Sequence, residues 1–314
     1  MTIRAVLHPA SVPGLAEEVA ATPGVELVEA VNDDDVEAAL ADGAPILLTY
    51  TWHERFLKPG LKWVQGVGAG FEQYPLHDFD REGIVLTTAT GVHVCVAEGA
   101  FGLLLALTRR IADAVRDAQR REWIVREGPE LAGSTIGIIG LGTIGEAFAK
   151  RAQGWDVELI GFKRHPEQYK GVVPRVFGPD KLLEVCRLSD VLVITMPGSA
   201  DTHHLIGVEE LDALGEGWLI NVGRGSVVNE QALVAALASG RLRGAGLDVF
   251  EVEPLPASSP LWDMPNVVIT PHSAGNTPRY GERLGRIFRQ NLLAFQDGMT
   301  WVNRVVDGRR LDEA

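Results

Sequence analysis

The chain has 314 residues, a formal net charge of −13, and 46% hydrophobic and 23% charged residues. This length favours about two domains over a single core. The acidic balance argues against a nucleic-acid-binding surface, and no apolar run reaches the ~18–20 residues of a membrane span, so we expect neither kind of partner. The two cysteines, Cys95 and Cys186, are too few for a disulfide framework or a zinc cluster. We therefore predict no metal site and a reduced, cytoplasmic setting, and the N-terminal stretch lacks the apolar run of a signal peptide.

The first part of the chain alternates short apolar runs with helix-like segments. Strands are predicted at 3–8, 25–31, 45–49, 61–67 and 83–88, and helices at 11–22 and 33–41. This alternation predicts a small α/β unit with a parallel sheet. Gly68-Ala69-Gly70 directly follows one of these strands, and the N–H groups of such a turn could hold a small anion such as a carboxylate. An ordinary strand-ending turn explains the local sequence equally well.

Residues 94–121 form the longest helical pattern in the chain. The first half is apolar nearly all round, which indicates burial, and the second half is amphipathic. A helix of this kind suits a connection between two domains.

The stretch TIGIIGLGTIGEAFAK follows at 135–150. A strand rich in β-branched residues leads into Gly140, Gly142 and Gly145, which have the G-x-G-x-x-G spacing, and a helix begins directly after them. Strand, glycine turn and helix in this order are the context of a dinucleotide-binding fingerprint. Gly140 permits the tight turn, Gly142 lets the backbone approach a pyrophosphate, and Gly145 allows the helix and strand to pack closely.

The same alternation continues beyond the glycine turn and ends in an amphipathic helix and a polar tail. Strands are predicted near 135–139, 157–162, 172–177, 190–195, 217–222, 244–249 and 266–270, and helices near 143–153, 179–186, 208–214, 229–238 and 278–297. The expected fold class is α/β, with two doubly wound parallel-sheet domains: a flavodoxin-like substrate domain and a Rossmann dinucleotide-binding domain.

The domain assignment follows from this order of elements. We assign residues 1–93 and 285–314 to the substrate domain and residues 94–284 to the dinucleotide-binding domain. The helices near 94–121 and 278–297 are the expected links, and the cleft between the domains is the expected ligand site.

Three charged residues follow the C-terminal ends of predicted strands: Arg224, Glu253 and His272. These ends lie on one edge of a parallel sheet, where the glycine turn also lies, so the side chains can converge. Arg224 is permanently charged and forked and can hold an α-keto carboxylate. His272 can give a proton to the substrate carbonyl, and Glu253 can orient the imidazole and favour its protonated form. Each residue alone also fits a structural role, and their convergence beside a nucleotide fold favours hydride transfer between 2-oxo and 2-hydroxy acids.

The whole chain resembles the D-isomer-specific 2-hydroxyacid dehydrogenase family. The matching segments are VGAG (67–70), VAE (96–98), GIIGLGTIG (137–145), NVGRGSVVNEQALVAAL (221–237), GAGLDVFEVEPLP (244–256) and ITPHSAGNT (269–277). The resemblance implies that Arg224 binds the substrate carboxylate and carbonyl, that His272 is the acid/base, and that Glu253 pairs with it. Glu253 is a glutamate, unlike the glutamine of the formate dehydrogenase branch, and Glu72 stands where an aspartate commonly follows the carboxylate turn.

The resemblance also implies a cofactor site and a second substrate contact. The backbone turn Gly68-Ala69-Gly70 would hold the substrate carboxylate, and Asp248 would bind the nicotinamide amide. The implied cofactor-binding residues are Gly140, Gly142, Thr143, Ile144, Thr195, Met196, Pro197, Val222, Asp248 and His272.

The choice between NAD and NADP depends on the residues after the second strand of the nucleotide domain. NAD-preferring proteins place an acid there, roughly 20 residues past the glycines, to bind the ribose 2′-hydroxyl. In this chain ELIGF is followed by Lys163-Arg164-His165. A basic pair without an acid would attract a 2′-phosphate, and a generic surface cluster of charges is the alternative. We predict that NADP(H) is preferred and NAD(H) possible.

The predicted function is an NADP(H)-preferring D-2-hydroxyacid dehydrogenase or 2-oxo acid reductase with a small substrate such as glyoxylate, hydroxypyruvate or a branched-chain oxo acid. One alternative is an enzyme resembling D-3-phosphoglycerate dehydrogenase. Another is a non-catalytic corepressor-like protein that senses the cofactor. Activity with oxo acids separates the sensor from the enzymes. The resemblance further implies a homodimer formed through the nucleotide domain.

Overall fold

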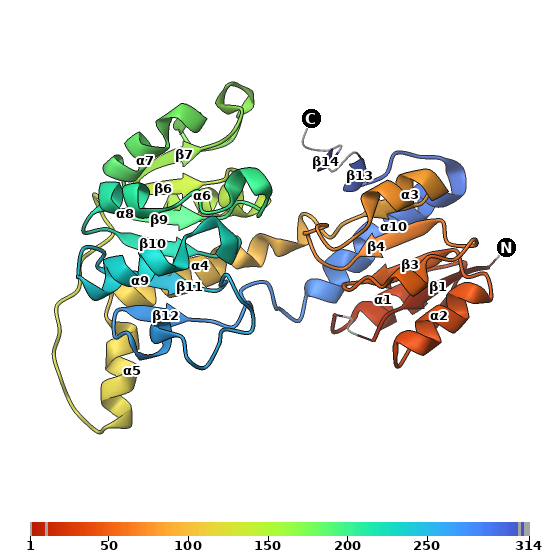
Figure 1. Cartoon of the computed structure of the whole chain (residues 1–314), viewed down its shortest axis with the longest axis horizontal. Coiled ribbons are helices and arrows are strands. Elements are labelled where there is room, and N and C mark those ends of the chain that lie inside the picture. Colours follow the sequence, from red (N-terminus) through yellow and green to blue (C-terminus); the bar gives the residue numbers. More distant parts are fainter. Residues whose placement is uncertain (1, 10–11, 307–308, 311–314) are drawn as a thin grey trace. The chain divides into compact units, whose positions relative to one another are not determined.

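The structure is a computed structural model that describes residues 2–9, 12–306 and 309–310. The chain divides into two compact units: unit 1 comprises Met1–His93 and Asn276–Ala314, and unit 2 comprises Val94–Gly275. Each unit is built around its own β-sheet with helices on both faces (Figure 1). The predicted class of two doubly wound α/β domains is confirmed.

Unit 1 contains the five strands predicted for the first part of the chain. The five predicted strands are β1 (Ile3–Leu7), β2 (Val25–Glu29), β3 (Ile46–Thr49), β4 (Trp63–Gly66) and β5 (Val85–Thr87). Two further strands, β13 (Arg304–Val306) and β14 (Arg309–Arg310), join the same sheet. Among the described residues their order is β14-β13-β5-β4-β3-β1-β2. The first five strands are parallel to one another, whereas β13 pairs antiparallel with β5 and with β14. The sequence predicted only a polar tail here. Val305 is buried in the core, which explains why the tail joins the sheet.

Helices cover both faces of this sheet. They are α1 (Leu15–Ala20), α2 (Asp33–Ala41), α3 (Leu76–Glu82) and α10 (Tyr280–Asp297), with 3₁₀ turns at Glu54–Phe56 and Val92–Cys95. Side chains of α1 and α10 pack with Ala5, Leu7 and Trp63, while those of α2 and α3 pack with Val6 and Val64 on the other face. Neighbouring residues of β1 and β4 thus face opposite sides of the sheet, as successive side chains of a strand do. The helix predicted at 11–22 begins at Leu15, and its predicted first residue, Ser11, lies outside the described residues.

Unit 2 contains a parallel sheet whose strands agree with the predicted ones. The strands are β6 (Thr135–Ile139), β7 (Glu158–Phe162), β8 (Arg175–Phe177), β9 (Val191–Ile194), β10 (Trp218–Asn221), β11 (Gly244–Leu247) and β12 (Val267–Ile269). Their order in the described chain is β12-β11-β10-β9-β6-β7-β8. The strand order therefore reverses at β6, which lies between β7 and β9. Ligands of open α/β sheets bind at such a switch point, outside the carboxyl ends of the strands.

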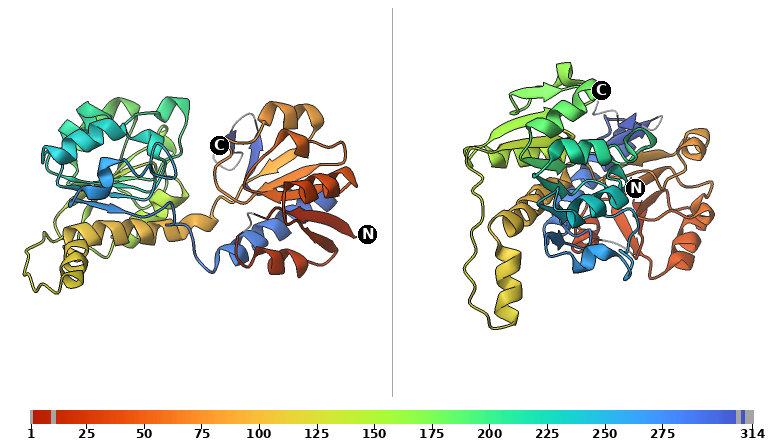
Figure 2. Two further views of the ribbon diagram at one scale, coloured as in Figure 1. Left: turned by 60° about the horizontal axis from the view of Figure 1, so that its bottom comes forward. Right: turned by 60° about the vertical axis from the view of Figure 1, so that its left-hand side comes forward.

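The helices of unit 2 also form two layers. They are α4 (Val96–Thr108), α5 (Ile111–Gln119), α6 (Thr143–Ala152), α7 (Leu182–Leu188), α8 (Val208–Leu214) and α9 (Glu230–Ala238), with 3₁₀ turns at Pro166–Gln168, Pro179–Lys181, Ala200–Thr202, Gly225–Val227 and Pro260–Asp263. Helices α4 and α6 pack on one face of the sheet, and α7, α8 and α9 pack on the other. Figure 2 shows α4 lying along its face of the sheet.

The long helix predicted at 94–121 is two helices. The chain turns after Thr108, where Arg110 has a left-handed backbone with φ 56°, and the two helical segments meet at a bend of 68°. A Cβ on Gly128 would lie 2.2 Å from the carbonyl oxygen of Thr108, so the returning backbone passes directly over the end of α4. The single-helix prediction was wrong because this contact is distant in sequence and the break contains neither glycine nor proline.

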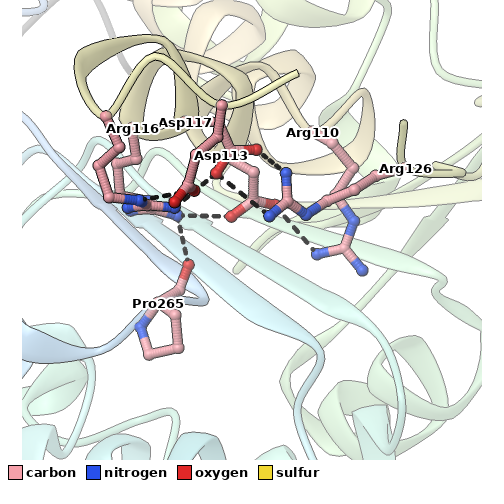
Figure 3. Close-up of polar contacts among 8 residues, drawn as sticks. Arg110, Asp113, Arg116, Asp117, Arg126 and Pro265 are labelled. Atoms are coloured by element: carbon pink, nitrogen blue, oxygen red, sulfur yellow. Dashed lines mark hydrogen bonds and ion pairs between the residues drawn. The ribbon is translucent and has the colours of Figure 1, made fainter. Parts of the chain in front are cut away.

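We define the arm as residues 111–130, which comprise α5 and the extended segment that follows it. Asp117 anchors the extended segment, because its buried carboxylate accepts hydrogen bonds from Arg126 and Arg120. Arg116 bonds Asp113 and the carbonyl oxygen of Pro265, which ties the arm to the loop before β12 (Figure 3). Beyond these ties the arm extends away from the sheet (Figures 1 and 2).

Within the described residues, no single helix is long and apolar enough to span a membrane. The segments Val92–Thr108 and Ile111–Gln119 pass such a test of length and composition only as a bent pair. The apolar residues of α4 are buried in the core of unit 2.

The chain returns to unit 1 earlier than predicted. Residues 276–284 were assigned to the dinucleotide-binding domain but lie in unit 1. Their packing explains the difference: the hydroxyl of Tyr280 donates to the carbonyl oxygen of Val67 at 2.5 Å, and a Cβ on Gly281 would lie 2.5 Å from the backbone of Gly14. Helix α10 therefore belongs entirely to unit 1, whereas α4 and α5 belong to unit 2.

Both cysteines are buried in the structure. Burial raises the pKa of the Cys186 thiol to about 12, so this side chain stays neutral and unreactive at ordinary pH. The Sγ atom of Cys95 lies 3.4 Å from the carbonyl oxygen of Gly275. Both residues belong to the buried core.

Candidate active site

The carboxyl ends of β10, β11 and β12 bring Arg224, Glu253 and His272 together. The three strands are parallel and pair in register, so their ends lie side by side. The three side chains line one open pocket of about 270 Å³, which is formed entirely by unit 2. The other residues lining this pocket are Gly225, Ser226, Phe250 and Glu251.

Glu253 holds His272 by a short hydrogen bond. The Nδ1 atom of His272 lies 2.6 Å from Oε2 of Glu253. An ionised carboxylate only accepts, so Nδ1 carries the proton and Nε2 is the nitrogen that exchanges a proton with a ligand. The second carboxylate oxygen, Oε1, accepts the N–H of Phe250 at 3.0 Å, which fixes the carboxylate from its other side. Both side chains are partly exposed, at 42% for His272 and 34% for Glu253, so a ligand can reach the imidazole.

Asp248 anchors the loop that carries His272. Its Oδ1 atom accepts hydrogen bonds from Oγ1 of Thr270 at 2.6 Å and from the N–H groups of Ser273 and Ala274 at 2.9 and 3.2 Å. Its carbonyl oxygen accepts the N–H of His272 at 2.8 Å. His272 itself has a left-handed backbone with φ 50°, a conformation that costs energy for a residue with a side chain and persists only when the surroundings hold it.

Arg224 lies at a tightly packed junction between two loops. The buried Asn221 accepts the N–H of Gly223 at 3.1 Å and donates to the carbonyl oxygen of Arg224 at 3.0 Å. A Cβ on Gly225 would lie 1.8 Å from the carbonyl carbon of Phe250, so only glycine fits between the loops. The guanidinium of Arg224 donates to the carbonyl oxygen of Gly223 at 2.8 Å.

The glycine turn has the geometry that a pyrophosphate needs. Gly140 has φ 101°, and a Cβ on Gly145 would lie 2.1 Å from the carbonyl oxygen of Gly140. A Cβ on Gly142 would meet no protein atom within 4 Å, so the backbone there faces open space at the start of α6. The first N–H groups of a helix have no intrahelical acceptor and attract anions. The turn thus fits the diphosphate of a dinucleotide.

The predicted segment Thr195-Met196-Pro197 supports the turn from the neighbouring strand. The hydroxyl of Thr195 donates to the carbonyl oxygen of Gly140 at 2.5 Å, and a Cβ on Gly140 would lie 2.7 Å from Cβ of Met196. Val222 is buried, and its N–H donates to the carbonyl oxygen of Ile194, directly before this segment, at 3.1 Å.

The three basic residues after β7 each contact a different partner. The Nζ atom of Lys163 lies 3.5 Å from the carbonyl oxygen of Leu141 in the glycine turn. The guanidinium of Arg164 pairs with Oδ2 of Asp201 at 3.1 Å, and His165 lies 3.5 Å from Glu167. Lys163 and Arg164 therefore lie on the side of β6 where the adenosine end of a dinucleotide binds.

The carboxylate turn Gly68-Ala69-Gly70 lies in unit 1 directly after β4. The carbonyl oxygen of Gly68 accepts the N–H of Ala89 at 2.8 Å. A Cβ on Gly68 would lie 2.9 Å from the ring of Tyr50.

Sequence reasoning missed the supporting groups Asn221, Phe250 and Thr270 and the anchoring role of Asp248. Asn221 and Asp248 are polar residues at the ends of apolar strands, and that pattern is a usable signal for a buried polar anchor. The contact of Phe250 uses its backbone N–H, which no residue type encodes.

A dinucleotide fold with a carboxylate-oriented histidine and an arginine at its sheet edge is typical of nicotinamide-dependent oxidoreductases. The family model described as D-isomer specific 2-hydroxyacid dehydrogenase, NAD binding domain, matches residues 101–274. The glyoxylate reductase of Thermofilum pendens is 38% identical over 249 residues, which cover 76% of this chain and 73% of the relative. The glyoxylate/hydroxypyruvate reductase B of Pectobacterium atrosepticum is 37% identical over 257 residues, 79% of each chain.

Solved structures agree with these relatives. The NADPH-dependent glyoxylate/hydroxypyruvate reductase of Sinorhizobium meliloti, in complex with citrate, matches at a TM-score of 0.84 and 30% identity over 98% of this chain and 99% of that chain. The same enzyme in complex with NADP and malonate matches at a TM-score of 0.82. The chain belongs to the D-isomer-specific 2-hydroxyacid dehydrogenase family. It is a nicotinamide-dependent oxidoreductase that acts on the CH–OH group of small 2-hydroxy acids or on the corresponding 2-oxo acids.

Proposed function

We propose that this chain is a reductase of small 2-oxo acids that prefers NADP(H), with His272 as the acid/base, Glu253 as its orienting partner and Arg224 as the substrate anchor. The observation that carries the proposal is the 2.6 Å contact between Nδ1 of His272 and Oε2 of Glu253, in the wall of a pocket that Arg224 also lines. Relatives named as glyoxylate and hydroxypyruvate reductases support this substrate class.

The chemistry follows from these three side chains. A reduced nicotinamide dinucleotide held at the turn of Gly140, Gly142 and Gly145 would supply the hydride, with its electron pair, that C2 of the 2-oxo acid receives. Arg224 binds the substrate carboxylate, and its charge favours the negative charge that develops on the carbonyl oxygen. Nε2 of the protonated His272 gives its proton to that oxygen, which yields the 2-hydroxy acid and a neutral imidazole. Glu253 balances the imidazolium charge before the transfer and keeps Nε2 directed into the pocket.

A panel of 2-oxo acids tests this function. Glyoxylate, hydroxypyruvate and a branched-chain oxo acid are assayed with NADPH and with NADH, for the wild type and for His272→Ala. We expect reduction by the wild type and a loss of about 10²- to 10⁴-fold in kcat for the variant, with little change in the Kd for NADPH. A wild-type protein that binds NADPH but reduces no oxo acid would instead be a cofactor sensor of the corepressor kind.

The preference for NADP(H) is supported by Lys163 and Arg164, which follow β7 with no acid at the adjacent positions of the sequence. The NADPH-dependent enzyme of Sinorhizobium meliloti is a structural relative. Replacing both residues by serine should lower kcat/KM with NADPH at least about tenfold relative to NADH, because charge-assisted bonds to the 2′-phosphate are lost. The matched control replaces Arg175 and Lys181, which pair with Glu184 on the surface of the same unit. An unchanged NADPH/NADH ratio in the Lys163/Arg164 variant contradicts the preference.

The backbone turn Gly68-Ala69-Gly70, the nicotinamide contact of Asp248, and the cofactor contacts of Thr143, Ile144 and Val222 are part of the same proposal. Their support is the resemblance of their segments to the family. The cytoplasmic setting, supported by the two reduced core cysteines, also belongs to it.

The homodimer is proposed to form through the arm. Its apolar side chains are exposed: Ile111, Val115, Trp123, Ile124 and Val125. Trp123 is 97% exposed, and exposed apolar clusters of this kind mark protein interfaces. Light scattering after size-exclusion chromatography should give twice the chain mass for the wild type and the single mass for a Trp123→Glu/Val125→Glu variant. A monomeric wild type would contradict the proposal.

A further inference from the structure

An ion pair joins the two loops on either side of the glycine turn. Arg164 follows β7, and Asp201 lies in the 3₁₀ turn Ala200–Thr202 after β9. Because β6 lies between β7 and β9, the contact of 3.1 Å between the Arg164 guanidinium and the Asp201 carboxylate bridges the loops that flank the turn after β6. The adenosine end of a dinucleotide binds at this edge.

The turn that presents Asp201 is internally braced. The hydroxyl of Thr202 accepts the N–H of Ser199 at 2.8 Å and donates to the carbonyl oxygen of Pro197 at 3.0 Å. Thr202 is buried, whereas the side chain of Asp201 is 77% exposed. The backbone of this turn therefore holds the Asp201 carboxylate at the protein surface. The side chain can be replaced without disturbing the hydrophobic core of unit 2.

The charges of this ion pair affect how a 2′-phosphate can bind to Arg164. Of the two predicted phosphate-binding residues, Arg164 pairs with an acid in the described structure, whereas Lys163 contacts a carbonyl oxygen. A phosphate that binds Arg164 must displace the carboxylate or lie beside it, and two anions on one guanidinium repel each other. A ribose 2′-hydroxyl carries no charge and leaves the ion pair intact.

We propose that Asp201 is a specificity-determining residue for the cofactor. It holds Arg164 across the adenosine end of the site and competes with the 2′-phosphate of NADP(H) for the guanidinium, so it weakens the preference for NADP(H) over NAD(H). This inference rests on the proposed role of Arg164 in binding the 2′-phosphate. It adds a residue from the neighbouring loop that opposes that role.

The first test is the Kd of the Asp201→Asn protein for NADPH and for NADH, measured by nucleotide fluorescence. We expect the Kd for NADPH to fall about 1.5- to fivefold at low ionic strength, the range for an exposed charge pair, and the Kd for NADH to stay unchanged. The gain should shrink at high salt because the interaction is screened. A Kd for NADPH that does not fall overturns the inference.

Glu167→Gln is the matched control, because Glu167 is an exposed acid paired with His165 next to Arg164. Its effect on the Kd for NADPH should be smaller than that of Asp201→Asn. If the two variants improve NADPH binding equally, the gain comes from general charge and not from competition for Arg164, and the inference is wrong.

A double-mutant cycle separates this inference from the proposed cofactor preference. Arg164→Ala alone should weaken NADPH binding, and adding Asp201→Asn to it should give no further change. A gain of the same size in the Arg164→Ala background overturns the role of Asp201. If Arg164→Ala weakens NADPH binding but Asp201→Asn has no effect in either background, only the inference fails. If Arg164→Ala leaves both Kd values unchanged, the role of Arg164 in the preference fails as well.

Discussion

Nδ1 of His272 lies 2.6 Å from Oε2 of Glu253, while the other oxygen of the same carboxylate accepts the N–H of Phe250. A backbone N–H thus fixes Oε1 of the glutamate, while Oε2 holds the imidazole. This arrangement sets both the orientation and the tautomer of the ring. The first prediction concerns this contact.

Glu253→Gln should lower kcat for 2-oxo acid reduction by about 10²- to 10⁴-fold, because an amide supports the wrong tautomer equally well and cannot balance an imidazolium charge. The Kd for NADPH should change little. Steady-state kinetics and a nucleotide titration check both. Glu251→Gln is the control, because that carboxylate lines the same pocket but pairs with His204. Equal losses of kcat in the two variants would remove the special role of Glu253.

Arg224→Lys should lower kcat/KM for the oxo acid by about 10²-fold or more, because an ammonium cannot hold a carboxylate in a two-pronged geometry. Binding of the cofactor alone should be unchanged. The control is Arg243→Lys, a surface residue paired with Glu216. A variant with normal kcat/KM would place the substrate carboxylate elsewhere.

Asp248→Asn should loosen the loop of His272. The amide keeps one acceptor oxygen for Thr270 and Ser273 but places an NH2 donor where Oδ2 accepts the N–H of Ala274 at 3.1 Å. Two donors then face each other, and the lost bond costs about 1–3 kcal/mol. We expect a lower melting temperature and a lower kcat. Thr270→Val removes a single donor to this carboxylate and should have the same effects in a milder form.

The outcome for Asp248 distinguishes two roles. A protein with normal melting temperature and kcat, but with weaker nucleotide binding, would mean that Asp248 contacts only the nicotinamide. A loss of stability together with kcat supports the anchoring role described above. Calorimetry and single-turnover kinetics provide the two readouts.

The pH dependence of stability should show the contribution of Asp33 in unit 1. Its carboxylate bonds His8 at 2.8 Å and pairs with Arg55 at 3.2 Å, and these contacts, the bond from His8 first, hold the pKa of Asp33 below its usual value of 3.8. A carboxylate with a lowered folded-state pKa stabilises the fold above its unfolded-state pKa, and this contribution is lost as the pH falls through the folded-state value.

Asp33→Asn should therefore unfold at a lower urea concentration than the wild type at pH 7. The difference should shrink as the pH falls below about 4. Asp34→Asn is the control, because Asp34 is exposed and pairs only with Arg55 among the described contacts. A difference that persists unchanged at acid pH would contradict the assignment.

The repeated pattern of apolar runs was enough to predict strands β1 to β12 and most of the helices, but not β13 and β14. A buried strand needs a short β-branched run, and β6 has one whatever surrounds it. The glycine turn is equally local, because Gly140 needs φ 101° within a few residues of β6. The order of strands along the chain then places Arg224, Glu253 and His272 at one edge, since parallel strands end together.

Other features depend on contacts between residues that are far apart in sequence. At the break between α4 and α5, Gly128 lies against the carbonyl oxygen of Thr108, and β13 joins the sheet because Val305 is buried beside β5. Neither contact has a signal in the residues nearby.

The active site likewise has features that the local sequence predicts and features that depend on tertiary contacts. Residue types and their places after the strands were sufficient to predict that Arg224, Glu253 and His272 meet, and the three side chains line one pocket. Which carboxylate oxygen bonds which nitrogen, that Asp248 anchors the histidine loop, and that Asp201 pairs with Arg164 depend on folding. Hydrogen bonds are directional and short, so these contacts form only when the sheet of unit 2 and its helices have packed and brought the loops together.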